Sequence, residues 1–483
     1  MRGRRIPLGF ALAIAAWGAA ACGRQDPSSA TSAAAEASAP ALAAPPATGA
    51  EAVWSPPRNV LLVTLDTTRA DYVSCLGGDP RNTPHLDALA ADSALFTHAT
   101  SETNSTNPSH VTLMTGLRAI DHGVISNFQR LDPERDTLPR ALHRMGFKTA
   151  AFLAVAHLAQ GLGWRGFDAL PDVPDELEAA EVTRRALRWL RAQDGRQDER
   201  FFLWVHYYDA HTPYRPPPQL ARVFYSGDPE RGDEPPIRRE PFFNNLQEAS
   251  IWLGKARDRE WPKAMYAAEI AGVDAELGRL LAELDRLGFA DDTLVVVVAD
   301  HGESLGEHGI FYDHKGLYEQ QLRIPLIVHV PGLPPLRSDA AVSTLDVAPT
   351  IAALVGAGFE YRPTGLSLVP LLAGGAAPPG LADRVLVHQH AHNAAVAVRR
   401  GSWKGIWVID QEHVVLSGPP QLFDLDLDPG ELHDLAAALP QRLAELRPFA
   451  EPWLQLGPVP IGETPHLDEH ARDQLRALGY TDG

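Results

Sequence analysis

Five short apolar runs constrain the fold of this chain more than any other feature of its sequence. They lie at residues 59–65, 148–155, 201–208, 293–300 and 324–330. Runs of this length without polar alternation are typical of strands that are buried on both faces. Helical patterns separate them, and the clearest places apolar side chains at Tyr266, Ile270, Val273, Leu277, Leu281 and Leu284. This order predicts an α/β fold with a mostly parallel central sheet covered by helices on both faces.

Acidic and histidine side chains stand where three of these runs stop. Asp66 follows the first run, "HYYDAH" at 206–211 ends the third, and Asp300 and His301 end the fourth. A single Asp at a strand end usually makes a turn. Three such clusters, however, would share the edge of a parallel sheet at which ligands bind. We therefore expect a divalent metal site with oxygen and nitrogen ligands at this edge.

A polar stretch, "TSETNSTNPSHVTLMTG" at residues 100–116, surrounds one proline. Taken alone, it predicts a loop rich in Ser, Thr and Asn that caps a helix beginning near Ser109. The same side chains are also suited to a catalytic loop, and only the rest of the chain decides between the two interpretations.

Seven motifs occur along the chain in a fixed order. They are "NVLLVTLDTTRADYVSCLGG", "TPHLDALAADSALFTHAT", "NPSHVTLMTGLRAIDHGV", "FFLWVHYYDAHTPYRPP", "ADHGESLGEHGIFYDHKGLYEQQLRIPLIVHVPG", "STLDVAPTIAALVGA" and the tail "LDEHARDQLRALGYTDG". Together they resemble the sulfatase family of the alkaline phosphatase superfamily, over residues 58–440 and the tail. The resemblance implies an alkaline phosphatase-like α/β fold with a small C-terminal α+β subdomain.

The resemblance also implies site residues. The metal ligands would be Asp66, Thr106, Asp300 and His301, and the catalytic and substrate-contacting residues would be Thr106, His110, Asn127, His211 and Lys315. Asn127 follows Thr106 by 21 residues, which is the spacing of a substrate-contacting Asn in the phosphonate-monoester-hydrolase-like branch of the family.

The chain departs from the sulfatase pattern at the nucleophile. Sulfatases carry Cys or Ser there and oxidise it to formylglycine, whereas this chain has Thr106, with His110 in place of the usual Arg. Oxidation of threonine at Cβ would give a ketone, so formylglycine is not expected. Thr106 instead resembles the metal-activated threonine of the superfamily's phosphodiesterases and phosphotransferases. Thr67 also replaces a second Asp ligand, which favours Zn or Mn over Ca or Mg.

These residues predict a metal-dependent hydrolase or transferase in which Thr106 attacks a small anionic substrate, a phosphate or phosphonate ester. One alternative is a sulfuric ester hydrolase of the arylsulfatase type. A second is a catalytically degenerate sulfatase-like binding protein, although the complete set of matched residues argues against it. The formal net charge of −18 argues against nucleic acid as a main partner, because an acidic surface repels phosphate backbones.

The N-terminus predicts export and a lipid anchor. Arg residues precede an apolar stretch at 6–21, which is short for a spanning helix and typical of a signal peptide. The Ala residues before Cys22 resemble a bacterial lipobox, so we expect a signal peptide over 1–21, lipidation of Cys22 and a location on a membrane of the bacterial cell envelope. An ordinary secretory signal is the alternative. Residues 22–57 indicate a disordered Ala/Pro/Ser linker, residues 58–375 the catalytic domain, and residues 376–483 the C-terminal subdomain and tail.

Three features keep two interpretations each. His388, His390 and His392 alternate, so on a strand they would face one side and supply a second metal, but a solvated edge strand is favoured. Asp209 is ambiguous between a metal ligand and a structural residue. Residues 219–261 form either a surface insertion or a lid that selects the leaving group of the substrate.

Overall fold

The computed structural model describes residues 55–459, with the exception of 175, 197, 240–250 and 411–417. These described residues all belong to one compact unit. The expected signal peptide, the lipidated Cys22, the linker up to residue 54 and the tail from residue 460 lie outside the described residues. Within the described part of the chain, no helix has the length and apolar character needed to cross a membrane.

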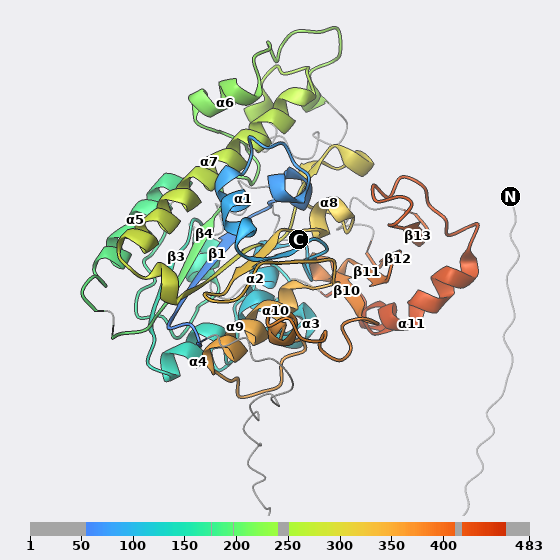
Figure 1. The fold of residues 1–483 in the computed structure, drawn as a ribbon. Coiled ribbons are helices and arrows are strands. Elements are labelled where there is room, and N and C mark those ends of the chain that lie inside the picture. The colour runs from blue at the N-terminus through green and yellow to red at the C-terminus, as the bar shows by residue number, and fades with distance from the viewer. Residues whose placement is uncertain (1–54, 175, 197, 240–250, 411–417, 460–483) are drawn as a thin grey trace, which may run out of the picture. The chain divides into compact units, whose positions relative to one another are not determined.

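A seven-stranded sheet in the order β3-β4-β1-β5-β8-β2-β9 forms the centre of the fold (Figure 1). Its strands are β1 (Asn59–Leu65), β2 (Ala94–Phe96), β3 (Lys148–Phe152), β4 (Phe201–Tyr207), β5 (Thr293–Ala299), β8 (Leu326–His329) and β9 (Leu336–Ser338). β3, β4, β1 and β5 are parallel. The expected mostly parallel α/β sheet is confirmed, and each of the five apolar runs contains a strand. β8 is antiparallel to β5, so its carboxyl end lies at the opposite edge of the sheet.

Helices cover both faces of this sheet, as Figure 1 shows. One layer contains α1 (Pro84–Ala91), α5 (Ala179–Arg191), α6 (Pro218–Phe224) and α7 (Glu260–Arg286), and the other contains α2 (Thr106–Thr115), α3 (Ala119–His122), α4 (Leu138–Arg144), α9 (Val347–Val355) and α10 (Val369–Leu372). The predicted helical pattern at 266–284 lies inside α7. All seven residues of β1 are buried, and Leu62 lies opposite Trp204 on one side and Val296 on the other. Burial of one such side chain contributes about 1.5–3 kcal/mol to folding.

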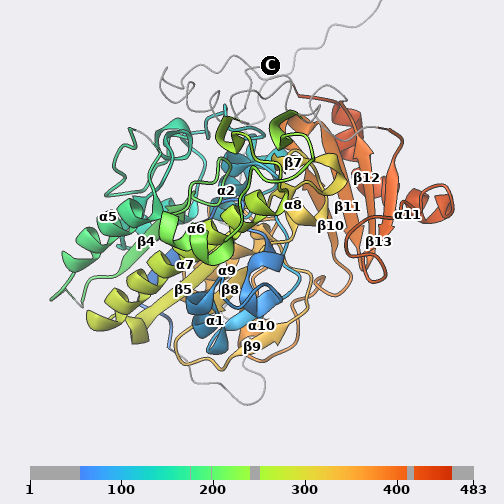
Figure 2. The same ribbon diagram turned by 90° about the horizontal axis from the view of Figure 1, so that it is seen from above.

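A second, smaller sheet contains the C-terminal strands (Figure 2). Its order is β10 (Val385–Gln389), β11 (Ala395–Arg400), β12 (Trp403–Val408) and β13 (Gln421–Asp424), and every pair is antiparallel. Helix α11 (Pro440–Leu456) packs on it through Leu446 and Trp453. Short elements β6 (Ser304–Leu305), β7 (Phe311–Asp313) and α8 (Glu319–Leu322) lie in the chain between β5 and β8. The expected small C-terminal subdomain is therefore present as an antiparallel sheet with one helix.

The outer edge of β10 pairs with the segment just before α2. Thr103 and Gln389 form a parallel bridge, and the Gln389 N–H donates to the Glu102 carbonyl at 2.9 Å. The favoured interpretation of a solvated edge strand is therefore wrong, because this pairing buries His388 and His390 to 1% and 3% exposure. The expectation that His392 shares their face is also wrong, since it follows the end of β10 and has a φ of 60°.

Candidate active site

Three neighbouring strands bring the expected metal ligands together. Leu65, the last residue of β1, pairs with Tyr207 of β4 and with Ala299 of β5. Asp66 and Asp300 therefore leave adjacent parallel strands at the same level. One ligand atom from each of Asp66, Asp300 and His301 lies within 4.8 Å of the other two, and all three side chains are buried. We call these three residues the metal group.

The imidazole of His301 is oriented as a metal ligand would be. Its Nδ1–H donates to the carbonyl of Gly302 at 3.0 Å, and its Nε2 is buried and makes no hydrogen bond. Burial lowers the pKa of His301 well below its ordinary value, so the ring is neutral. A neutral imidazole held by a backbone carbonyl presents the lone pair of its other nitrogen to a metal.

His206, which the sequence motifs did not indicate, orients Asp66. Its Nε2–H donates to Asp66 Oδ2 at 3.2 Å, while its Nδ1 accepts the N–H of Ala154 at 3.4 Å. Asp66 Oδ1 is buried and makes no hydrogen bond. His206 thus occupies one carboxylate oxygen and leaves the other for a ligand. The available signal was a histidine inside an otherwise apolar strand, where a polar side chain needs a buried partner.

Backbone N–H groups hold Asp300. Its Oδ1 accepts from Thr67 N at 3.1 Å and from His301 N at 2.7 Å, and its Oδ2 makes no hydrogen bond. Thr67 has a φ of 46°, which is uncommon for a β-branched residue. The Tyr266 hydroxyl stabilises this conformation by donating to the Thr67 carbonyl at 2.6 Å. The strained backbone conformation of Thr67 therefore directs its N–H toward the Asp300 carboxylate.

Thr106 is the first residue of α2, which begins three residues before the expected start at Ser109. This places Thr106 in the first turn, where N–H groups and the helix dipole favour anions. Its Oγ1 is buried and makes no hydrogen bond. Burial raises the pKa of Asp66 well above its ordinary value, and the neighbouring carboxyl of Asp300 and hydroxyl of Thr106 oppose this shift. The hydroxyl of Thr106 therefore lies beside the metal group.

His110 holds the backbone of Thr106 through a hydrogen bond. Its Nδ1–H donates to the Thr106 carbonyl at 2.8 Å, and its Nε2 accepts from the Thr64 hydroxyl at 3.1 Å. Burial lowers the pKa of His110 well below its ordinary value. A neutral ring with both nitrogens engaged offers no charge to a substrate, so the structure places His110 as a residue that positions Thr106.

Asn127 fixes the N-terminus of α2. Its Oδ1 accepts from Ser105 Oγ at 3.0 Å and from Asn107 N at 2.8 Å, which satisfies a first-turn donor of the helix. Its Nδ2 is buried and makes no hydrogen bond, so one amide donor remains for a substrate oxygen. His157, another residue without a sequence signal, holds Asn107 through a 2.9 Å bond between its Nδ1 and Asn107 Oδ1.

Two histidine rings and one lysine lie on another side of the metal group. The ring of His314, which the motifs did not single out, lies 4.5 Å from that of His301 and 5.6 Å from that of His211. His211 Nδ1–H donates to the Thr212 carbonyl at 2.6 Å, and burial lowers the pKa of His211 to about 4. Lys315 has a side chain that is 30% exposed, and its Nζ forms an ion pair with Asp313 at 3.2 Å. The structure thus brings His211 to the site and leaves Lys315 at its rim.

The other ambiguous residues lie outside the metal group. Asp209 Oδ1 accepts the N–H of Ala179 at 2.8 Å and so caps α5. His388 Nδ1–H donates to the Ser101 carbonyl at 2.7 Å. Among the described residues, the only cluster with the spacing of metal ligands is Asp66, Asp300 and His301. The described structure therefore gives no support to a second metal held by the alternating histidines.

The described part of the insertion at 219–261 packs close to residues that support the site. Trp252 and Trp261 join an apolar cluster with Tyr214 and Tyr266. Tyr266 holds Thr67, and the Tyr214 hydroxyl donates to Glu303 Oε2 at 2.5 Å. The described insertion is therefore more than a solvated loop, since it shares a core with side chains that position the metal group.

The donor atoms of the metal group fit a divalent cation. Asp66 Oδ1, Asp300 Oδ2 and His301 Nε2 are buried, make no hydrogen bond and lie close together. Burial raises the pKa of Asp300 well above its ordinary value, and the neighbouring charge of Asp66 raises it further. Two buried carboxylates in contact repel each other, and a bound cation removes this cost.

Comparisons with known proteins agree with this arrangement. The family model described as Sulfatase matches residues 58–357. The chain belongs to the sulfatase family. A second model, described as N-sulphoglucosamine sulphohydrolase, C-terminal, matches residues 306–445 of this sulfatase-family chain. Family membership makes the protein an ester hydrolase of a metal-using family, in agreement with the expected class.

Relatives of this sulfatase-family protein are named for different activities. The multifunctional alkaline phosphatase superfamily protein PehA of Trinickia caryophylli is 26% identical over 82% of this chain and 94% of its own length. Arylsulfatase K of Bos taurus is 26% identical over 82% of each chain. The crystal structure of phosphonate monoester hydrolase of Agrobacterium radiobacter has a TM-score of 0.67 and 26% identity, and the match covers 83% of this chain and 95% of that chain.

Proposed function

We propose that the protein hydrolyses phosphate or phosphonate esters with Thr106 as the nucleophile. The observation that supports this most directly is the position of Thr106 Oγ1. It is buried at the first residue of α2, where its neighbour is the Asp66 carboxyl and no backbone carbonyl of the described residues bonds to it. An inert buried hydroxyl normally bonds to a neighbouring carbonyl, as Thr115 of the same helix does with Val111.

The reaction follows from the residues around Thr106. Its Oγ attacks phosphorus while the hydroxyl proton passes to solvent, the bond from phosphorus to the leaving oxygen breaks, and the leaving group takes up a proton from solvent. Water then attacks the same phosphorus, the bond to Thr106 Oγ breaks, and threonine is restored. The positive end of the α2 helix dipole and the Asn127 amide stabilise the non-bridging oxygens. His110 and Asn127 hold Thr106 in place throughout.

The metal group supplies the activation that a threonine hydroxyl needs. A divalent cation held by Asp66, Asp300 and His301 would provide Lewis-acid chemistry, lowering the pKa of the hydroxyl and offsetting substrate charge. The donor set of two carboxylates and one imidazole favours Zn or Mn over Ca or Mg.

Threonine favours phosphorus over sulfur. A formylglycine hydrate has a second hydroxyl through which a covalent sulfate ester collapses, and a threonine ester has none. The threonine ester must be broken by water at the esterified centre, as in phosphothreonine intermediates. The second candidate is sulfuric ester hydrolysis, which the similarity to arylsulfatase K supports.

Substitution of Thr106 tests the proposal. Thr106→Ala should lower turnover by about 10³-fold or more while metal binding persists, and Thr106→Ser should keep partial activity. Thr115→Ala serves as the control, because it removes a buried hydroxyl on the same helix whose partner is Val111. Aryl phosphate, phosphodiester, phosphonate and sulfate esters should be compared with the Zn- and Mn-loaded protein. Turnover of sulfate esters with phosphorus esters inert would favour the second candidate.

The N-terminal sequence supports an exported, lipid-anchored form of this enzyme. With a bacterial host, the mature protein should partition into detergent, and Cys22→Ser should move it to the soluble fraction with unchanged specific activity. Partitioning of Cys22→Ser like the wild type would contradict the anchor.

A further inference from the structure

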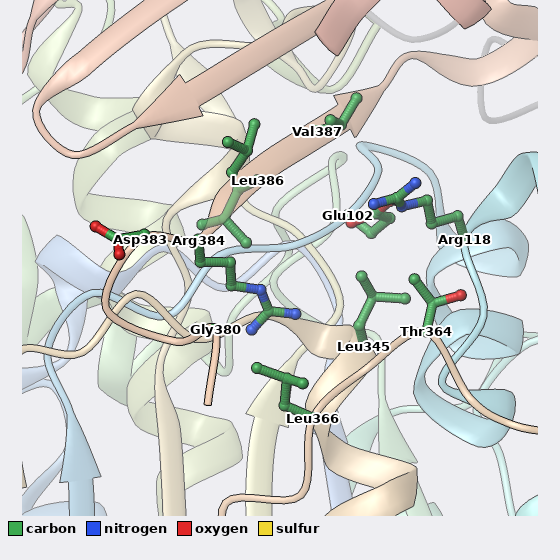
Figure 3. A pocket seen from close by; sticks show the side chains of 11 residues that line it. Glu102, Arg118, Leu345, Thr364, Leu366, Gly380, Asp383, Arg384, Leu386 and Val387 are labelled. Carbon is green, nitrogen blue, oxygen red and sulfur yellow. The ribbon is translucent and has the colours of Figure 1, made fainter. Parts of the chain in front are cut away.

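A pocket of about 280 Å³ lies beside β10, and none of the residues of the metal group lines it (Figure 3). Its walls come from the segment before α2, the residue Arg118 after α2, the loop following α9 and the start of β10. Leu345, Leu366 and Leu386 form an apolar part of the lining. Glu102 and Arg118 face each other at one end of the pocket (Figure 3).

Glu102 is a buried carboxyl whose side chain makes no hydrogen bond to the described residues. Its exposure is 2%, and its nearest charged neighbour is Arg118, whose Nε lies 3.8 Å from Oε1. Burial raises the pKa of Glu102 to about 8. This raised pKa favours the protonated acid near neutral pH, and its O–H donor has no acceptor among the described residues.

Arg118 is the cation at the polar end of the pocket. Its Nε is buried without a hydrogen-bond partner, and its guanidinium lies over the ring of Trp453 at 5.5 Å. Arg384 also lines the pocket, but Asp346 neutralises it through contacts of 2.5 and 2.9 Å. The carboxylate of Asp383 turns away at the rim (Figure 3). With Glu102 protonated, the Arg118 guanidinium loses its ion-pair partner at 3.8 Å and can receive an anion.

We propose that this pocket binds a small organic carboxylate. The anionic head lies between Arg118 and Glu102, and a short apolar body contacts Leu345, Leu366 and Leu386. A guanidinium fork matches a carboxylate geometrically, and the protonated Glu102 donates the remaining hydrogen bond. The volume lies just below the usual range for ligand pockets of about 300–1,000 Å³, which limits the body to a few carbons.

Butyrate is the probe, and its binding is measured by ligand-observed NMR titration of the metal-loaded protein near neutral pH. Wild type should bind it saturably. Arg118→Gln should weaken binding by about tenfold or more, because a charge-assisted contact is lost. Thr364→Trp should also abolish binding, since Thr364 lies at the exposed rim and a large ring there fills the entrance. Arg185→Gln, on α5, is the matched control and should bind as wild type.

A second experiment measures how butyrate binding depends on pH and on Glu102. The charged groups that face Glu102 are Arg118, Arg384, Asp121 and Asp346. Above about pH 8 its ionised carboxylate should pair with Arg118 and repel butyrate, whereas Glu102→Gln should keep its affinity at high pH. The proposal is overturned if wild type shows no saturable binding, if Arg118→Gln and Thr364→Trp both bind like wild type, or if Glu102→Gln loses affinity with pH as wild type does.

Discussion

Removal of the His206 ring should weaken metal binding without touching a metal ligand. In the wild type, His206 Nε2–H donates to Asp66 Oδ2 at 3.2 Å, and both side chains are fully buried. His206→Ala leaves that oxygen without a partner in an apolar strand. Asp66 is then free to rotate. Metal binding requires Asp66 to be ionised, and in the variant this carboxylate lacks its only side-chain donor from β4.

The magnitude follows from the charge on Asp66. Burial raises the pKa of Asp66 in the metal-free protein, so the hydrogen bond there is one between neutral groups and contributes about 0.5–1.5 kcal/mol. A cation requires the ionised carboxylate, for which the bond contributes about 1.5–3 kcal/mol. The difference of about 1–1.5 kcal/mol corresponds to about tenfold in Kd. Residues that orient metal ligands contribute about 10–100-fold in affinity or activity, so the expected weakening lies in that range.

The assay is isothermal titration of metal-free protein with Zn²⁺ and with Mn²⁺, paired with kcat/KM for an aryl phosphate. His122→Ala is the matched control. His122 is a buried ring with two hydrogen bonds, to Thr112 Oγ1 at 3.1 Å and from Val124 N at 3.1 Å, and it has no bond to the metal group. Both variants should lose thermal stability, but only His206→Ala should lose metal affinity. Equal Kd values for His206→Ala and wild type would refute the reasoning, and so would an equal loss in both variants.

Three further predictions follow from other buried groups. Burial raises the pKa of Glu269 from 4.5 to about 9, so the folded protein retains a proton that the unfolded chain releases. The associated stability is complete below about pH 4.5 and is lost as the pH rises toward about 9. Urea unfolding at about pH 5 and about pH 9 should show this loss, and Glu269→Gln should reduce it. Asp346→Ala should cost about 3–5 kcal/mol in urea unfolding, because Arg384 would remain as a buried charge without its partner; a loss below 1 kcal/mol would contradict this. Asn127→Asp keeps the acceptor that caps α2 but removes the Nδ2 donor, so kcat/KM should fall by about tenfold or more with an unchanged melting temperature; an unchanged kcat/KM would exclude Asn127 from substrate contact.

The parts of the fold that depend on local burial could be predicted from the sequence. A strand covered on both faces is apolar along its whole length, so β1, β4 and β5 were visible as runs. The residues that follow each strand of a parallel sheet lie at the same edge of that sheet. The sequence alone therefore predicts that Asp66 and Asp300 lie close together. Strands β2 and β9 have three residues each, and so short a run has no distinctive pattern.

The supporting residues could not be predicted because their roles depend on partners far away in the chain. The role of His206 depends on its contact with Asp66, and the role of His314 depends on its position beside His301. The sequence predicts that His388 is exposed on an edge strand. The prediction is wrong because the partner of His388, the Ser101 carbonyl, precedes it by 287 residues. Helix α2 begins at Thr106 rather than Ser109 because Asn127 supplies the acceptor for its first turn, and no local residue indicates that.

The pairing between β10 and the segment before α2 also determines when the enzyme becomes complete. A chain that ends before residue 385 contains Thr106 and the whole metal group but lacks the strand that bonds to the Glu102 carbonyl and the Thr103 segment. During synthesis the segment before α2 therefore precedes its pairing partner, β10, by more than 280 residues. Contacts over such sequence separations form slowly. In the exported protein that we propose, this pairing can form only after residues 385–389 have crossed the membrane.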